Sequence, residues 1–123
     1  MTTTSDTRVL LVEDADDIIE LVRLVLDDTG YSLAVATDGE AGRAAACAAA
    51  PDGIQLDMSL PKISGWDLVP LLRADGVTAP IVALTAHAMR GARERALSLG
   101  CSAYLSKPFE IAALLDVLDN ARP

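Results

Sequence analysis

The sequence contains few of the residues that mark several large classes of protein. Aromatic residues make up only 3% of the chain, and its two cysteines, Cys47 and Cys101, have no CxxC or histidine partner spacing. This pattern excludes a zinc site of the usual spacing and a disulfide framework, so we expect both cysteines to be small buried hydrophobic residues. No apolar run approaches the roughly 20 residues of a membrane span, and residues 1–7 have neither a basic start nor an apolar stretch. We therefore expect a cytoplasmic protein without membrane contact.

Positive charge is also scarce. The net charge is -8 and the isoelectric point is near 4.4, so no basic stripe is present to neutralise a phosphate backbone, and we expect no direct contact with nucleic acid. With 123 residues, 51% of them hydrophobic, the chain is most simply one domain. Because aromatic residues are rare, its core must be built from Ala, Leu, Val and Ile, which suits helices packed on a parallel sheet.

Apolar and polar residues alternate along the chain in a way that predicts five strands and five helices. The predicted helices span Asp16–Asp28, Glu40 to about Ala50, Trp66 to about Asp75, Ala88–Leu99 and Glu110–Asn120, and the predicted strands span Val9–Val12, Tyr31–Ala36, Ile54–Leu56, Ile81–Leu84 and Tyr104–Ser106. Pro70 removes a backbone donor inside the third helix, so we expect a late start or a kink there. Strict alternation without a repeat or linker predicts a right-handed, doubly wound α/β fold with a parallel sheet.

Four apolar runs end at polar residues of the kinds that handle phosphate and a hard cation. The first run ends at Glu13 and Asp14, and the later runs end at Asp57, Thr85 and Lys107. In open α/β sheets, ligands bind outside the carboxyl ends of the strands. If these runs are parallel strands, all five side chains gather at one edge of the sheet.

The three carboxylates predict a cation site. At an effective dielectric near 20, each close pair repels by roughly 4 kcal/mol, so a fold keeps the cluster only with a compensating cation. Carboxylates with a carbonyl and waters suit Mg²⁺, Lys107 can reach a phosphoryl oxygen, and Thr85 adds a hydroxyl donor. Asp57 stands alone at the centre of the sheet, so we expect it to be the nucleophile that forms an aspartyl phosphate.

The motifs at these strand ends resemble those of the receiver domains of two-component response regulators. The residues are VLLVED at 9–14, LDMSLP at 56–61 with Gly65, LTA at 84–86 and LSKP at 105–108. The resemblance covers nearly the whole chain, with residues 1–7 as a flexible tail and residues 8–121 as the receiver domain. It implies a flavodoxin-like fold with strand order 2-1-3-4-5 and five helices. Gly53 and Gln55 depart from it, because this strand is usually more apolar in the family.

The resemblance also implies roles for individual residues. Asp57 would accept a phosphoryl group from a phosphohistidine on a sensor histidine kinase or a histidine phosphotransfer protein. The implied Mg²⁺ ligands are Asp14 and Asp57 directly, Glu13 through water, and the backbone carbonyl of Ser59. Thr85 would turn toward the phosphoryl group, and Tyr104 would move inward as its aromatic switch partner. Lys107 would contact the phosphoryl group, with a cis peptide before Pro108.

Each residue taken alone also has a simpler interpretation. Acidic residues cap helices, an aspartate or threonine at a strand end is common, and a lysine is usually solvated. Tyr104 could be a core or rim aromatic residue, and His87, with no partner at ligand spacing, reads as an exposed residue at a helix start. The arginines from Arg90 to Arg95 form either a solvated face, which we favour, or a docking surface for an acidic partner.

The motifs bear on four possible functions. We favour a receiver that is switched by phosphorylation and controls partner binding without turning over a separate substrate. The alternatives are the receiver portion of a hybrid histidine kinase and a small phosphatase or phosphotransferase with an aspartyl nucleophile. Ser59 disfavours the last, since such hydrolases usually place a second aspartate at this position. A flavin or nucleotide binder is disfavoured because no glycine-rich loop follows the first strand.

Overall fold

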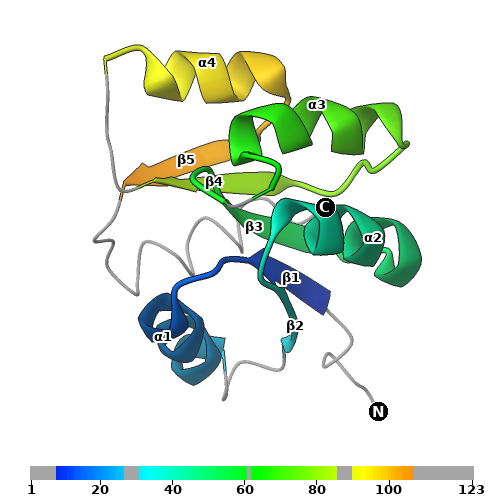
Figure 1. Cartoon of the computed structure of the whole chain (residues 1–123), viewed down its shortest axis with the longest axis vertical. Helices are drawn as coiled ribbons and strands as arrows, with labels where there is room; N and C mark the ends of the chain where they lie inside the picture. Colours follow the sequence, from blue (N-terminus) through cyan, green and yellow to red (C-terminus); the bar gives the residue numbers. More distant parts are fainter. Residues whose placement is uncertain (1–7, 27–30, 61, 86–89, 107–123) are drawn as a thin grey trace.

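The structure, a computed structural model, describes residues 8–26, 31–60, 62–85 and 90–106, which form a parallel sheet with helices on both faces (Figure 1). The strands are β1 (Arg8–Val12), β2 (Ser32–Ala36), β3 (Gly53–Asp57), β4 (Ile81–Thr85) and β5 (Ala103–Ser106), and the helices are α1 (Asp16–Leu26), α2 (Gly39–Ala49), α3 (Gly65–Ala74) and α4 (Ala92–Leu99). The strand order β2-β1-β3-β4-β5 confirms the expected topology. The helix expected at 110–120 lies outside the described residues.

The two faces of the sheet carry separate hydrophobic clusters. Along β1, Leu10 and Val12 belong to the cluster under α2, α3 and α4, whereas Val9 and Leu11 belong to the cluster under α1. All four side chains are at most 2% exposed. Because neighbours in a strand point to opposite faces, continuous apolar runs are needed where both faces are covered. Burial of each such side chain contributes about 1.5–3 kcal/mol before entropy is counted.

Helix α3 begins earlier than the sequence suggested. Ser64 is its N-cap and accepts a hydrogen bond from the backbone nitrogen of Asp67 at 3.4 Å, so the helix starts at Gly65. The late start that Pro70 led us to expect is therefore wrong. Pro70 is exposed and lies inside the helix. Capping by serine satisfies a donor of the first turn and fixes the start ahead of the proline.

Helix α4 begins later than the sequence suggested. We expected a helix from Ala88, but Arg90 and Gly91 form a turn and the helix starts at Ala92. Gly91 is the N-cap, with a φ of 81° that an α-helix cannot contain, and no side chain caps this end. Arg90 thus lies outside the helix that carries the other two arginines, and His87 lies outside the described residues.

The cysteines differ in their surroundings. Cys101 is buried, as expected, but Cys47 is exposed on α2, so the expectation of a buried Cys47 is wrong. Alanine-rich helices give little periodic signal, and the direction of position 47 was not evident from its neighbours. Among the described residues, no helix has both the length and the apolar character needed to cross a membrane.

Candidate functional site

Three carboxylates meet at the carboxyl ends of β1 and β3. Glu13 and Asp14 directly follow β1, and Asp57 is the last residue of β3. Register places Val12 beside Leu56, so the next residues of the two strands emerge at the same sheet edge. One ligand oxygen from each of Glu13, Asp14 and Asp57 lies within 4.8 Å of the other two. The structure therefore brings together the three acidic residues that the sequence singled out.

The carboxylates are unequally buried. Glu13 is 0% exposed and Asp57 is 4% exposed, whereas Asp14 is exposed. Oε2 of Glu13 accepts hydrogen bonds from the backbone nitrogens of Asp14 and Ala15, both at 3.2 Å. Burying carboxylates is costly unless donors or cations compensate. Glu13 is thus held below the surface, and Asp14 faces solvent at the mouth of the site.

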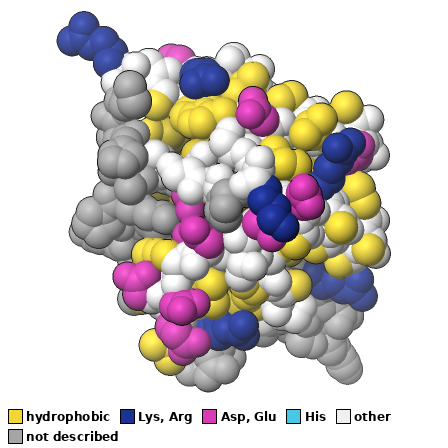
Figure 2. Space-filling view, in the orientation of Figure 1, with side chains coloured by type: hydrophobic (Ala, Val, Ile, Leu, Met, Phe, Trp, Pro, Cys, Tyr) yellow, Lys and Arg dark blue, Asp and Glu magenta, His cyan; other side chains and the backbone are white. Residues whose placement is uncertain are grey.

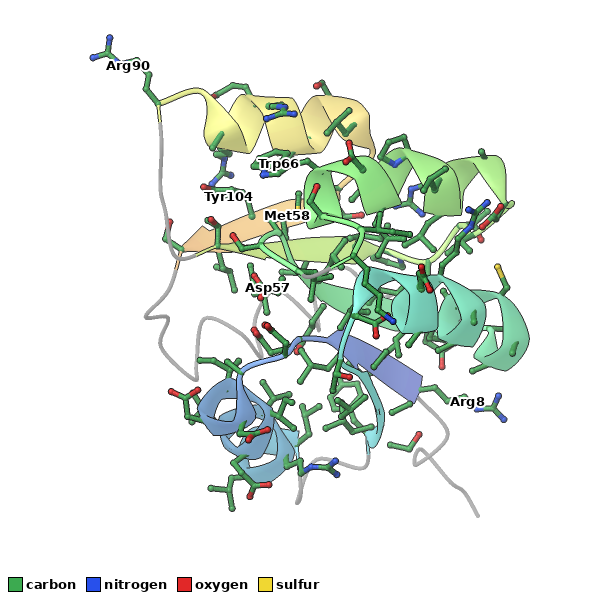
Figure 3. The ribbon with its side chains drawn as sticks, in the orientation of Figure 1. Arg8, Asp57, Met58, Trp66, Arg90 and Tyr104 are labelled. Carbon is green, nitrogen blue, oxygen red and sulfur yellow. The ribbon has the colours of Figure 1, made fainter. Side chains whose placement is uncertain are left out.

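The loop after β3 holds Asp57 in position. The backbone nitrogen of Ser59 donates to Oδ1 of Asp57 at 3.0 Å, which leaves Asp57 at the end of the strand facing the loop that follows β1 (Figure 3). This bond turns the chain directly after the strand, so the backbone of Ser59 lies beside the carboxylate of Asp57. The carbonyl of Ser59 is therefore carried by the same short turn that orients Asp57.

Gly65 is required by close contact rather than by an unusual backbone angle. A Cβ atom at Gly65 would lie 2.6 Å from Cα of Met58 and 2.9 Å from the carbonyl oxygen of Asp57. The backbone nitrogen of Gly65 also donates to the carbonyl oxygen of Met58 at 3.1 Å. Any side chain at position 65 would thus push α3 away from the residue that follows Asp57.

Met58, to which the sequence analysis assigned no role of its own, is only 1% exposed and belongs to the hydrophobic cluster under α2, α3 and α4. Its role in anchoring the turn was therefore missed. An apolar residue directly after a strand-end aspartate was the available signal, since a solvent-facing loop has no need of one.

Two further predicted site residues, Thr85 and Tyr104, lie on β4 and β5. Thr85 is the last residue of β4, is 4% exposed and pairs with Ser106. Tyr104 is half-buried and packs against the same cluster as Met58, and its buried hydroxyl has no hydrogen-bond partner among the residues that the structure describes. Lys107 and Pro108 lie outside the described residues. The structure thus brings Thr85 to the sheet edge that carries Asp57.

The donor set fits a hard divalent cation. All three converging side chains offer carboxylate oxygens. Mg²⁺ prefers such oxygen ligands, keeps several waters, and is commonly bound by one or two carboxylates together with phosphate oxygens. Figure 2 shows that acidic side chains also gather over α1, beside the loop that carries Asp14.

Comparison with known proteins identifies the family. The model of the response regulator receiver domain matches residues 9–119, so the chain belongs to this family. It is 38% identical over 108 residues to the transcriptional regulatory protein DltR of Streptococcus agalactiae, a match that covers 88% of this chain and 48% of DltR. The chain thus spans about half the length of this curated relative.

Solved structures of receiver domains have the same fold. The Francisella response regulator 1452 receiver domain superposes with a TM-score of 0.89 at 25% identity, over 94% of this chain and 96% of that one. The receiver domain of the sensor histidine kinase PA1611 of Pseudomonas aeruginosa has a TM-score of 0.84 at 34% identity, over 94% and 96% of the two chains. That structure holds a magnesium ion in its active site cleft.

Proposed function

We propose that Asp57 accepts a phosphoryl group from a phosphohistidine of a sensor histidine kinase or a histidine phosphotransfer protein. The observation that carries this proposal is the convergence of Glu13, Asp14 and Asp57 within 4.8 Å at the end of the sheet. Membership of the receiver family makes a phosphorylation-controlled switch the function of the domain. Asp57 is favoured as acceptor over its neighbours because it ends the central strand and is oriented by the Ser59 amide.

The transfer step exchanges one bond for another. A carboxylate oxygen of Asp57 forms a bond to phosphorus as the bond from phosphorus to the donor imidazole nitrogen breaks, and that nitrogen takes the electron pair and then a proton. Alignment and charge neutralisation are what such a transfer chiefly needs. Asp14 and Asp57 directly, Glu13 through water, and the Ser59 carbonyl would hold Mg²⁺. When bound, the ion neutralises charge on the phosphoryl oxygens.

Thr85, Tyr104 and Lys107 are proposed to read the new phosphoryl group. Thr85 ends the strand beside β3 and has a hydroxyl donor. The cross-strand neighbour of Thr85 is Ser106, and Tyr104 lies two residues before Ser106 on β5. In the proposed switch, Thr85 turns toward the phosphoryl group, Tyr104 moves further inward, and Lys107 pairs with a phosphoryl oxygen. The resulting change in surface controls partner binding.

The chain acts as a receiver and not as an enzyme of the usual kind, and we propose that it turns over no separate substrate. Ser59 stands where aspartyl-nucleophile hydrolases usually carry a second aspartate.

We propose residues 8–121 as the receiver domain. The names of the curated relatives, which are about twice as long, weigh against extending our expectation of no nucleic-acid contact to a full-length protein. The alternative that this chain is the receiver portion of a hybrid histidine kinase also stays open, because one of the similar structures is the receiver domain of a sensor histidine kinase.

The test is phosphorylation by a small donor. Incubation with Mg²⁺ and acetyl phosphate should add one phosphoryl group to the native chain, as measured by intact mass, and none to Asp57→Asn. Asp16→Asn is the matched control, since Asp16 is an exposed aspartate of the first turn of α1 outside the carboxylate cluster. An undiminished adduct on Asp57→Asn, or no adduct on the native chain, contradicts the assignment.

A further inference from the structure

Helix α4 is held on the body of the protein very differently at its two ends. At its C-terminal end, the Arg73 guanidinium donates to the carbonyl oxygen of Gly100 from Nε at 3.2 Å and from Nη2 at 2.7 Å. The same guanidinium donates from Nη1 to the carbonyl oxygens of Val77 at 2.9 Å and Ala79 at 2.8 Å. This end of α4 is therefore fixed by charge-assisted hydrogen bonds that also hold the loop after α3.

The N-terminal half of α4 has much weaker attachments. Its N-cap is Gly91, which has no side chain to satisfy the first-turn donors. The buried residues of the whole helix are two alanines, and only Ala92 of these lies in the N-terminal half. Alanine buries little apolar area. Within the described part of the chain, one specific side-chain contact holds this half: the Arg95 guanidinium lies over the Trp66 ring, with Cζ 4.4 Å from the ring centroid. Arg95 is exposed on α4, and Trp66 lies at the start of α3.

Trp66 is joined to the phosphorylation site by a short series of contacts. It follows Gly65, which approaches Met58 too closely to leave room for a Cβ atom and is hydrogen-bonded to it. Met58 in turn follows Asp57. Figure 3 shows Trp66 between α3 and α4, and Trp66 and Tyr104 pack against the hydrophobic cluster that includes Met58. Because Gly65 is in close contact with Met58, a displacement of Met58 should also displace the first turn of α3.

We infer that the Arg95–Trp66 contact is a latch that holds the N-terminal half of α4 down in the unphosphorylated protein, with the Arg73–Gly100 hydrogen bonds as the hinge. The inference rests on the proposed phosphorylation of Asp57 and adds the residues through which that event reaches α4. In this scheme, a phosphoryl group on Asp57 displaces the Ser59 amide, which donates to Oδ1 of Asp57 in the unphosphorylated protein, and with it the adjoining Met58. The first turn of α3 then shifts, the Trp66 ring moves relative to Arg95, and α4 is released at one end.

The strength of the latch suits a switch. A cation–π contact at an exposed site changes an equilibrium constant by about two- to fivefold. A contact of this size biases the position of α4 without fixing it, so a modest displacement of Trp66 is enough to change the population. Arg95 is a positioning residue in this scheme, because it acts on the site only through Trp66.

The test compares Arg95→Gln with Arg93→Gln, which removes the same charge from another exposed position of α4. Hydrogen exchange of the segment 90–99 is followed by mass spectrometry before and after phosphorylation by acetyl phosphate with Mg²⁺. In the native chain and in Arg93→Gln, phosphorylation should speed exchange by about two- to fivefold. In Arg95→Gln, exchange should already be faster by that factor, and phosphorylation should add little. Emission from Trp66, the only tryptophan of the chain, should follow the same pattern.

The outcomes separate the latch from the proposed function. If intact mass shows the adduct but Arg95→Gln exchanges like Arg93→Gln, the latch is overturned. It is also overturned if exchange is faster in Arg95→Gln but phosphorylation still adds the full native increment, because the contact is then merely structural. If the native chain acquires no adduct, the proposed function fails. The latch itself still stands or falls on the difference between the two variants without phosphodonor.

Discussion

At the scale of single residues, Gln55 is the side chain least suited to its surroundings. It is 0% exposed, and neither its amide nitrogen nor its amide oxygen has a hydrogen-bond partner in the described part of the chain. Its cross-strand neighbours are Leu11 on β1 and Val82 on β4, both in the apolar cluster under α1. Leaving a buried amide unsatisfied costs about 1–3 kcal/mol. The sequence marked this residue as unusual, but only the register shows that it faces apolar neighbours.

Replacing Gln55 with leucine should stabilise the protein. Leucine has a similar size and no polar atoms, so the free energy of unfolding measured in urea should rise by about 1–3 kcal/mol. Gln55→Glu is the informative counterpart: it places a charge at the same site and should lower the free energy of unfolding. A Gln55→Leu variant less stable than the native chain would show that the amide makes favourable contacts.

At the scale of elements, the order of strands and helices could be predicted, but helix boundaries could not always be. Periodicity located the start of α1 and both ends of α3 to within one residue, because apolar spacing and caps are local signals. The start of α4 was misplaced by four residues of sequence. Gly91 was visible there, but a glycine only permits a positive φ, and tertiary packing decides whether it is used.

The link between α2 and α3 provides a pH-dependent prediction. The Arg43 guanidinium donates to Asp75 from Nε at 2.6 Å and from Nη2 at 2.8 Å. The hydrogen bond from Arg43 holds the pKa of Asp75 below its ordinary value of 3.8. The stabilisation from this pair is therefore fully present above pH 3.8 and is lost as the pH falls through the lowered pKa.

Asp75→Asn should thus be less stable than the native chain at pH 7, with a difference that shrinks in acid and disappears below the folded pKa of Asp75. Urea unfolding at a series of pH values measures this difference. Asp16→Asn, at an exposed aspartate of α1, serves as the control for loss of one negative charge. A difference independent of pH would show that the Arg43–Asp75 pair does not depend on the ionised carboxylate.

At the scale of the whole molecule, the convergence of Glu13, Asp14 and Asp57 was predictable because it follows from the strand topology. Parallel strands end at one edge, so strand-end residues far apart in sequence had to meet there. The sequence could not predict that Glu13 is completely buried while the adjacent Asp14 is exposed, because the depth of each depends on how the loop after β1 packs. The strand order came from family resemblance and is confirmed by the observed pairing.

Mg²⁺ should stabilise the folded protein. The unfolded chain disperses the three carboxylates, so the ion binds the native state preferentially, and binding at about 100 times its dissociation constant adds about 2.7 kcal/mol. Thermal melts in millimolar MgCl₂ should show a higher Tm than melts in NaCl of equal ionic strength. Asp14→Asn should reduce the response to Mg²⁺. Equal melting temperatures in the two salts would contradict a cation site at the cluster.

The difference in exposure between Cys47 and Cys101 has a practical consequence. Burial raises the pKa of the Cys101 thiol to about 11, with nearby Arg73 opposing the shift, so almost no thiolate exists there at neutral pH. Cys47 is the other cysteine of the chain and lies on the surface of α2. A maleimide dye can therefore be attached to the native sequence at a single known point. Energy transfer between that dye on α2 and Trp66 on α3 can therefore report the distance between these neighbouring helices without any engineering of the protein.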